Sequence, residues 1–345
     1  MSFPKVLGIF AAILFTVIGG AALLKGGKSP STVESFDAAP LEIELDSEIR
    51  MVSAVDKPAP PSPPPVVAPI PPVAPVSPPP VVHVRHDTPL PTADRVQEFF
   101  NKVEPRFPIV QTITYKSRVP WQKGRPAWLS DYAAHYSTSR HFIARSLNGK
   151  PDYLKQEVAE GGRFNVLNPD KKIEFYLLID TSRSKMWFYY HDLDTNERVL
   201  VKTYNVGLGR IDSTKPSGML TPLGTYRLGD KVAIYKPKMT GFHNGKKVEL
   251  IRVFGTRWIP FDKEIGECTA SPEGFGIHGV PWVAGEKGEL VENTDSLGKY
   301  ESDGCIRLAT VDIEEIFAIT ITKPTTIYLV KDFYEANLPG IEKGQ

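Results

Sequence analysis

The chain has 345 residues, of which 41% are hydrophobic, and a formal net charge of +1. This length exceeds one average domain and the hydrophobic content suffices for real cores, so we expect two folded units joined by unfolded connectors. A net charge near zero, without a run of Lys or Arg, argues against a nucleic-acid partner. The two cysteines, Cys268 and Cys305, are too few for a disulfide framework and lack CxxC spacing, so one of them is a candidate reactive thiol.

The N-terminus, residues 1–28, is predicted to be a membrane anchor. Residues 6–24 contain no charge and are flanked by Lys5 and Lys25. A run of this length can cross a bilayer as a helix. A cleaved signal peptide is the alternative, although its apolar core is usually shorter. We therefore expect the cytoplasmic membrane as a partner through residues 6–24.

Residues 29–91 are predicted to be a disordered linker. The first part is acidic and poor in aromatic residues, and prolines make up nearly half of residues 58–91. Neither composition supports a core, and the proline-rich part favours extended polyproline II. We interpret the segment as a spacer. The alternative is a docking ligand for SH3 or WW modules.

Residues 92–170 are predicted to form a small α+β module. A short helix is expected over 92–100, and an edge strand should follow. Apolar residues at helical spacing after Pro126 predict one helix, and Ser139 is a suitable N-cap for a second helix that ends at Asn148-Gly149. A turn then leads into a strand near Phe164.

This order of elements, with Gly161-Gly162-Arg163-Phe164 before the last strand, resembles a LysM module. The resemblance implies binding to the glycan strands of peptidoglycan. A small helical connector that packs on the next domain is the alternative.

Residues 171–331 are predicted to be a mostly β domain with one packed helix, followed by a C-terminal tail at 332–345. The helix is expected over 311–319 with Thr310 as its cap. Stretches rich in β-branched and aromatic residues predict strands at 173–179, 185–190, 199–206, 224–227, 248–254 and 326–330.

Two short motifs in this domain indicate chemistry: Gly276-Ile-His-Gly279 and Ser302-Asp-Gly-Cys-Ile-Arg-Leu308. A free thiol is only slightly ionised at neutral pH, so a cysteine nucleophile needs a nearby base. His278 is the candidate base and Cys305 the candidate nucleophile. Gly304 permits a tight turn, in which backbone N–H groups near Gly304 and Cys305 could form an oxyanion hole.

Together with Thr221-Pro-Leu-Gly-Thr-Tyr226, these motifs resemble the YkuD-type L,D-transpeptidase catalytic domain. The resemblance implies a β-sandwich with one packed helix and no cofactor. It also implies that the thiol attacks the third residue of a peptidoglycan stem peptide and expels D-Ala. The thioester would then pass to an acceptor amine. Candidate supporting residues are Ser302, Asp303, Gly304 and Gly279, and candidate substrate contacts are Arg307, Tyr226 and Trp282.

Two features depart from the family pattern. Asp303 stands where many members carry a second histidine, and its charge would raise the thiol pKa if it faced the sulfur. We expect it to point to solvent or to a basic partner. The stretch Pro281 to Glu301 is long for the family; it is interpreted as a lid, with a passive insertion as the alternative.

Several roles stay open at the level of sequence. Arg307 could orient the loop, bind a substrate carboxylate or make a structural salt bridge. Cys268 is expected to be an unpaired thiol, with a disulfide to Cys305 as the alternative. The histidines form no HExxH or similar set, so no metal is predicted.

The resulting hypothesis is an L,D-transpeptidase that is anchored in the bacterial cytoplasmic membrane, with its C-terminal domains outside. The alternatives are an L,D-carboxypeptidase, which would resolve the same thioester with water, and a non-catalytic wall-binding protein.

Overall fold

The computed structural model describes residues 89–150, 157–230 and 232–343. The predicted anchor and nearly all of the predicted linker lie outside these residues. Within the described part of the chain, no helix is long and apolar enough to cross a membrane.

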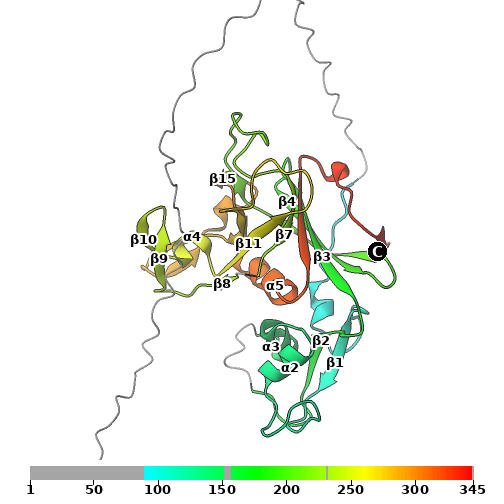
Figure 1. The fold of residues 1–345 in the computed structure, drawn as a ribbon. Coiled ribbons are helices and arrows are strands. Elements are labelled where there is room, and N and C mark those ends of the chain that lie inside the picture. Colours follow the sequence, from blue (N-terminus) through cyan, green and yellow to red (C-terminus); the bar gives the residue numbers. More distant parts are fainter. Residues whose placement is uncertain (1–88, 151–156, 231, 344–345) are drawn as a thin grey trace, which may run out of the picture. The chain divides into compact units, whose positions relative to one another are not determined.

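The first described elements form a small α+β layer (Figure 1). Ser139 caps α3 by accepting a hydrogen bond from the backbone N–H of Phe142 at 3.0 Å, and Gly149 ends this helix with a φ of 77°. Both caps agree with the sequence prediction, because a short hydroxyl suits an N-cap and glycine suits a left-handed C-cap. The elements are η1 (Val96–Phe99), β1 (Val110–Thr114), α2 (Leu129–His135), α3 (Arg140–Asn148) and β2 (Arg163–Leu167), with β1 antiparallel to β2.

The mostly β domain is built on a ten-stranded mixed sheet. The strands run in the order β16-β12-β11-β7-β17-β3-β4-β5-β18, and β8 pairs with β11. Helix α5 (Thr310–Thr320) buries Ile313, Ile316 and Phe317 in the same core as the sheet. The strands are β3 (Ile173–Asp180), β4 (Lys185–Asp192), β5 (Glu197–Asn205), β7 (Gly224–Leu228), β8 (Ala233–Ile234), β11 (Arg257–Glu264), β12 (Gly276–Gly279), β16 (Ile306–Leu308), β17 (Thr325–Val330) and β18 (Ile341–Glu342).

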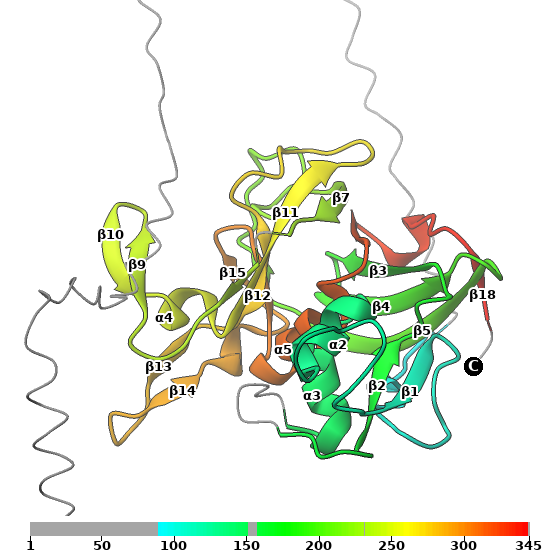
Figure 2. The ribbon, with the colours of Figure 1, turned by 60° about the horizontal axis from the view of Figure 1, so that its bottom comes forward.

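Two hairpins lie on either side of the short helix α4 (Ile251–Phe254), as Figure 2 shows. One is formed by β9 (Thr240–His243) and β10 (Lys246–Glu249), the other by β13 (Trp282–Ala284) and β14 (Leu290–Glu292). The stretch 281–301, interpreted above as a lid, contains the second hairpin, η3 (Thr294–Ser296) and the start of β15 (Tyr300–Ser302). The remaining short elements are β6 (Leu208–Gly209), which pairs with β15, and η4 (Phe333–Glu335).

The sequence predictions of secondary structure were wrong at three places. The strand expected over 248–254 is half strand and half helix, because β10 ends at Glu249 and α4 begins at Ile251. Thr310 is the first residue of α5 rather than its cap, and its N–H bonds to the Glu292 carboxylate at 2.8 Å. The helix expected over 92–100 is one short 3-10 turn.

The α+β layer and the β domain are joined by a common hydrophobic core and by ion pairs. Phe99 and Phe142 belong to the core of the large sheet. Glu314 on α5 lies 3.6 Å from Arg145 of α3 and 3.3 Å from Arg257 of β11. All three side chains are largely buried, so one carboxylate serves two guanidinium groups at this contact.

Candidate functional site

Strands β12 and β16 bring the two sequence motifs together. They pair in parallel, with Ile277 opposite Ile306 and His278 opposite Arg307. Paired residues of neighbouring strands point to the same face of a sheet, and successive residues alternate between faces. Ile277 and Ile306 are fully buried in the core, so His278 and Arg307 share the other face. Cys305 immediately precedes β16, which lies next to the strand that carries His278.

The turn that carries Cys305 is held by the hydroxyl of Ser302. This hydroxyl accepts a hydrogen bond from the N–H of Gly304 at 3.1 Å and donates one to the carbonyl of Cys305 at 2.6 Å. The sequence prediction of a supporting role for Ser302 agrees with these contacts. Because the N–H of Gly304 is used within the turn, it is not free to form an oxyanion hole in this conformation. The oxyanion hole expected from backbone N–H groups near Gly304 and Cys305 stays a prediction.

A second hydroxyl, that of Thr221, fixes the other side of the turn. It accepts from the N–H of Gly209 at 2.7 Å and donates to the carbonyl of Gly304 at 2.9 Å. Thr221 is fully buried and opens the Thr-Pro-Leu-Gly segment. Thr221 was part of the recognised motif but was not predicted as a site residue, because sequence alone did not indicate which backbone groups it binds.

Both the backbone conformation at position 304 and the crowding around it require glycine. Its φ is +120°, and a Cβ here would lie 2.6 Å from the Phe275 ring and 2.8 Å from the carbonyl oxygen of Leu220. Any larger residue would therefore displace the turn before the thiol.

The Cys305 side chain is half-buried. Its Sγ is 3.5 Å from the carbonyl oxygen of Gly274. Burial raises the pKa of the Cys305 thiol to about 11, while the N–H of Gly276 and the charge of Arg307 oppose this rise and Asp303 adds to it. The thiol is therefore protonated at neutral pH.

His278 is 3% exposed and neutral at the same pH. Burial lowers the pKa of His278 to about 4, against the carbonyls of Gly279 and Phe254, which favour the charged ring. Its Nδ1 lies 2.7 Å from the carbonyl oxygen of Gly279, which can only accept, so the neutral ring carries its proton on Nδ1. Nε2 is left as the proton acceptor. The rings of Phe254 and Trp258 lie against the imidazole.

Arg307 is half-buried and makes no hydrogen bond or ion pair with the part of the chain that the structure describes. Burial lowers its pKa, and its charge acts on both Cys305 and His278. The structural salt bridge considered for Arg307 does not form among the described residues. An unpaired, partly desolvated guanidinium is costly unless an anion binds to it.

Asp303 pairs with Arg210 rather than with the thiol. Their side chains meet at 2.6 Å, and the Asp303 side chain is 70% exposed. This agrees with the expectation of a basic partner. Arg210 was not predicted, because it lies far from the motif in sequence and is brought there by the bond between its N–H and the Ser302 carbonyl.

The two aromatic residues predicted to contact substrate occupy different positions. Tyr226 is fully buried, and its hydroxyl donates to the carbonyl of Ala270 at 2.6 Å, so it supports the core and does not reach a substrate in this conformation. Trp282 is half-buried on β13, and its Nε1 donates to the Thr310 hydroxyl at 3.3 Å. Gly279 supplies the carbonyl that orients His278.

Cys268 and Cys305 are both free thiols. Cys268 lies beside β7, with its Sγ 3.4 Å from the carbonyl oxygen of Thr225. Among the described residues, no group of three or more His, Cys, Asp or Glu side chains is arranged to hold a metal ion.

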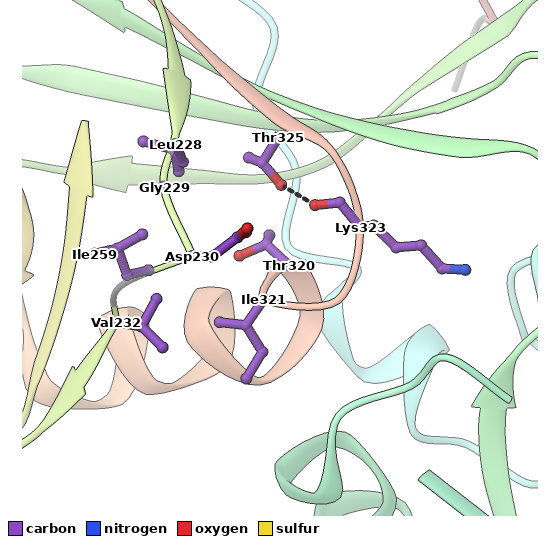
Figure 3. Close-up of a pocket in the computed structure, with 9 residues that line it drawn as sticks. All are labelled: Leu228, Gly229, Asp230, Val232, Ile259, Thr320, Ile321, Lys323 and Thr325. Atoms are coloured by element: carbon purple, nitrogen blue, oxygen red, sulfur yellow. Dashed lines mark hydrogen bonds between the residues drawn. The ribbon is translucent and has the colours of Figure 1, made fainter. Parts of the chain in front are cut away.

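A small pocket lies between β7, β11 and the turn after α5, shown in Figure 3. None of the candidate site residues lines it. The Lys323 side chain points away from the other labelled residues. The pocket lining is Leu228, Gly229, Asp230, Val232, Ile259, Thr320, Ile321, Lys323 and Thr325.

Residues 174–329 match the model of the L,D-transpeptidase catalytic domain, YkuD. This part of the chain is a YkuD domain. It includes every candidate site residue discussed above, and its bounds fall within the predicted 171–331. The family match does not extend to the α+β layer, and a LysM module is not identified there. A search of curated proteins found no match.

Solved structures similar to the chain include Bdellovibrio bacteriovorus Bd1075, with 16% identity, a TM-score of 0.30, and 46% of this chain and 48% of that chain covered. Another is the helical cell shape determining protein Pgp2 from Campylobacter jejuni, with 16% identity, a TM-score of 0.30, and 49% and 51% covered. The chain thus spans about half the length of these structures. TM-scores this low do not establish a shared overall fold.

Proposed function

We propose that the chain is a peptidoglycan L,D-transpeptidase in which Cys305 is the nucleophile and His278 the base. The observation that supports the proposal is the parallel pairing of β12 with β16, in which His278 lies on the strand next to the one that Cys305 immediately precedes, within the residues that match the YkuD model. The domain family supplies the substrate class, and the intact Cys305 and His278 pair favours an active enzyme over a silent wall-binding protein.

The protonation states favour general-base catalysis over a preformed ion pair. With a thiol pKa of about 11 and a histidine pKa of about 4, both groups are neutral at pH 7. Nε2 of His278 takes the thiol proton as Sγ attacks the carbonyl carbon of the third stem residue. The bond to D-Ala then breaks, the leaving amine takes that proton, and a thioester remains.

The second half-reaction restores the thiol. An acceptor amine attacks the thioester carbonyl, gives its proton to His278 and forms the cross-link, and the sulfur leaves and is reprotonated. Water in place of the amine gives an L,D-carboxypeptidase, which is the second candidate function. We further propose that Arg307 binds a carboxylate of the donor stem, since its guanidinium lacks a partner among the described residues.

The α+β layer is proposed to bind glycan strands. Trp128 is 61% exposed on this layer, and the Arg125 guanidinium lies over its ring at 4.3 Å. The alternative role as a connector is favoured by the packing of Phe142 into the core of the sheet. Sedimentation with purified sacculi, compared between the wild type and Trp128→Ala, separates the two roles, because a connector does not need Trp128 for binding.

The proposed location is outside the cytoplasmic membrane, because the substrate lies there and residues 6–24 could anchor the chain. Protease added to spheroplasts should digest the YkuD domain. Protection of this domain until the membrane is permeabilised would contradict the proposed location.

The reaction is tested by incubating the full chain with tetrapeptide muropeptides and analysing the products by mass spectrometry, beside the Cys305→Ala variant. Cysteine-dependent release of D-Ala with dimer formation supports the transpeptidase. Monomeric tripeptide alone supports the carboxypeptidase. No conversion by a folded protein with a reduced thiol leaves a wall-binding protein.

A further inference from the structure

The hairpin formed by β9 and β10, together with its flanks at 235–250, is strongly basic, and we call it the basic hairpin. Its one carboxylate, Glu249, is already engaged by the Arg252 guanidinium at 2.7 Å and by the N–H of Lys238 at 2.6 Å. Its lysine ammonium groups make no ion pair with the residues that the structure describes. They are all exposed: Lys236, Lys238, Lys246 and Lys247.

Apolar side chains are exposed beside these lysines. Phe242 is 70% exposed and Met239 is 43% exposed. The hairpin is a separate two-stranded sheet whose turn, Asn244-Gly245, has φ values of 50° and 71°. This is the geometry of a tight hairpin turn, so the lysines are displayed on a defined scaffold.

The basic hairpin is connected to the candidate catalytic histidine through aromatic packing. The His243 ring lies 5.2 Å from the Phe254 ring, which lies 5.5 Å from the His278 ring. Helix α4, which carries Phe254, also contacts β10 and β13. A polymer that places one reacting group beside His278 would therefore have its neighbouring groups close to the basic hairpin.

We propose that the basic hairpin binds the carboxylates of stem peptides that neighbour the reacting one on polymeric peptidoglycan. This inference rests on the proposed function for the identity of the polymer. Stem peptides carry free carboxylates at regular intervals along a strand, which matches several unpaired lysines near one reaction centre. Phe242 and Met239 offer apolar contact to the alkyl parts of the same stems.

The inference is tested by sedimentation of the full chain with purified sacculi, in a Cys305→Ala background so that binding is measured without turnover. The test variant is Lys246→Gln with Lys247→Gln. The matched control is Lys172→Gln with Lys331→Gln, which removes the same charge from two exposed lysines elsewhere in the domain. A parallel series uses sacculi whose carboxylates have been converted to neutral amides.

The hairpin variant should bind untreated sacculi about tenfold more weakly than the control at low ionic strength, since it loses two exposed ion pairs that each contribute modestly to binding. This difference should shrink at ~0.5 M salt and disappear on amidated sacculi, because screening and neutralisation both remove the attraction.

Equal binding by both variants overturns the inference. So does a difference that persists on amidated sacculi, since the contact would not be to carboxylates. A difference found only on vesicles of anionic phospholipid would instead assign the hairpin to a membrane surface. Because the background lacks the thiol, failure of the proposed reaction leaves this result unaffected and is detected separately by the muropeptide assay.

Discussion

The hydroxyl of Thr221 donates a hydrogen bond to the carbonyl of Gly304 over 2.9 Å, across 83 positions of sequence. The same oxygen accepts from Gly209, so replacing Thr221 with Val leaves two buried backbone groups unsatisfied. Each costs about 1–3 kcal/mol. We expect Thr221→Val to lower the free energy of unfolding by a few kcal/mol, and to reduce kcat/KM by about tenfold or more because the thiol is misplaced. Denaturant unfolding and steady-state kinetics measure the two effects.

Thr221→Ser is the matched control, since it keeps the hydroxyl. It should retain most of the activity. If Ser is impaired and Val is not, the methyl group and not the hydrogen bonds holds the turn.

Replacing Gly304 with Ala should be severely destabilising. The added Cβ would meet the Phe275 ring at 2.6 Å, and the backbone would remain at a φ of +120°. Conformational strain and overpacking of about 1–3 kcal/mol each are expected. Gly218→Ala is the control, because Gly218 also has a positive φ, +80°, but has no neighbour within 4 Å of its Cβ position. Equal losses of thermal stability in the two variants would show that the Phe275 contact is unimportant.

The protonation state of Cys305 predicts the pH dependence of its alkylation. With a pKa of about 11, the thiolate fraction rises about tenfold per pH unit between pH 7 and 10. The rate of reaction with iodoacetamide, measured in a Cys268→Ala background, should therefore increase through this range without a plateau. Arg307→Gln should slow the reaction at pH 8, because the guanidinium lowers the thiol pKa. A plateau beginning near neutral pH would indicate a thiolate–imidazolium pair.

Burial of His278 predicts a loss of stability in acid. Its pKa is lowered from 6.5 to about 4 in the folded state, so the unfolded chain takes up a proton first as the pH falls. The stabilisation is complete above pH 6.5 and is lost as the pH falls through about 4, amounting to roughly 3 kcal/mol. The difference in unfolding free energy between the wild type and His278→Gln should shrink by that amount from pH 7 to pH 4. A difference that does not change with pH would show that His278 titrates normally in the folded protein.

Replacing Glu314, which is outside the candidate site, should strongly lower the stability of the protein. Glu314→Gln would leave Arg145 and Arg257 largely buried without their shared carboxylate. Breaking a buried pair in this way costs about 3–5 kcal/mol. Glu197→Gln, which breaks the exposed pair with Lys343, should change stability by less than about 1 kcal/mol. Similar melting temperatures for the two variants would contradict the assigned importance of Glu314.

The sequence predicted the strands of the sheet core well, because β3, β4 and β5 are rich in β-branched and aromatic residues. The strand predicted over 248–254 was wrong, because this equally apolar stretch is divided between strand and helix. Apolar content alone cannot distinguish the two when the segment is this short. At the break, the Glu249 carboxylate accepts hydrogen bonds from the backbone N–H of Lys238 and from the Arg252 guanidinium, and the pattern of apolar residues does not reveal either contact.

The candidate site was predictable in its residue types but not in its bonding. Cys305 and His278 stand in recognisable motifs; His278 lies on β12, and Cys305 immediately precedes the neighbouring β16. The supports from Thr221 and Arg210 depend on long-range pairing that no local pattern encodes. Tyr226 was expected to contact substrate because of its motif, and the structure places its side chain in the core.

The aromatic cluster around Phe99 has a consequence for how this protein can be divided. Its ring contacts Phe107 and Phe142 on one side and Phe175 and Phe188 of the sheet on the other. A fragment that begins at residue 171 would therefore uncover the apolar face of its own sheet and should aggregate. Swapping or deleting the N-terminal layer at that boundary would expose this apolar surface, so any division of the chain has to keep Phe99, Phe107 and Phe142 together with the sheet.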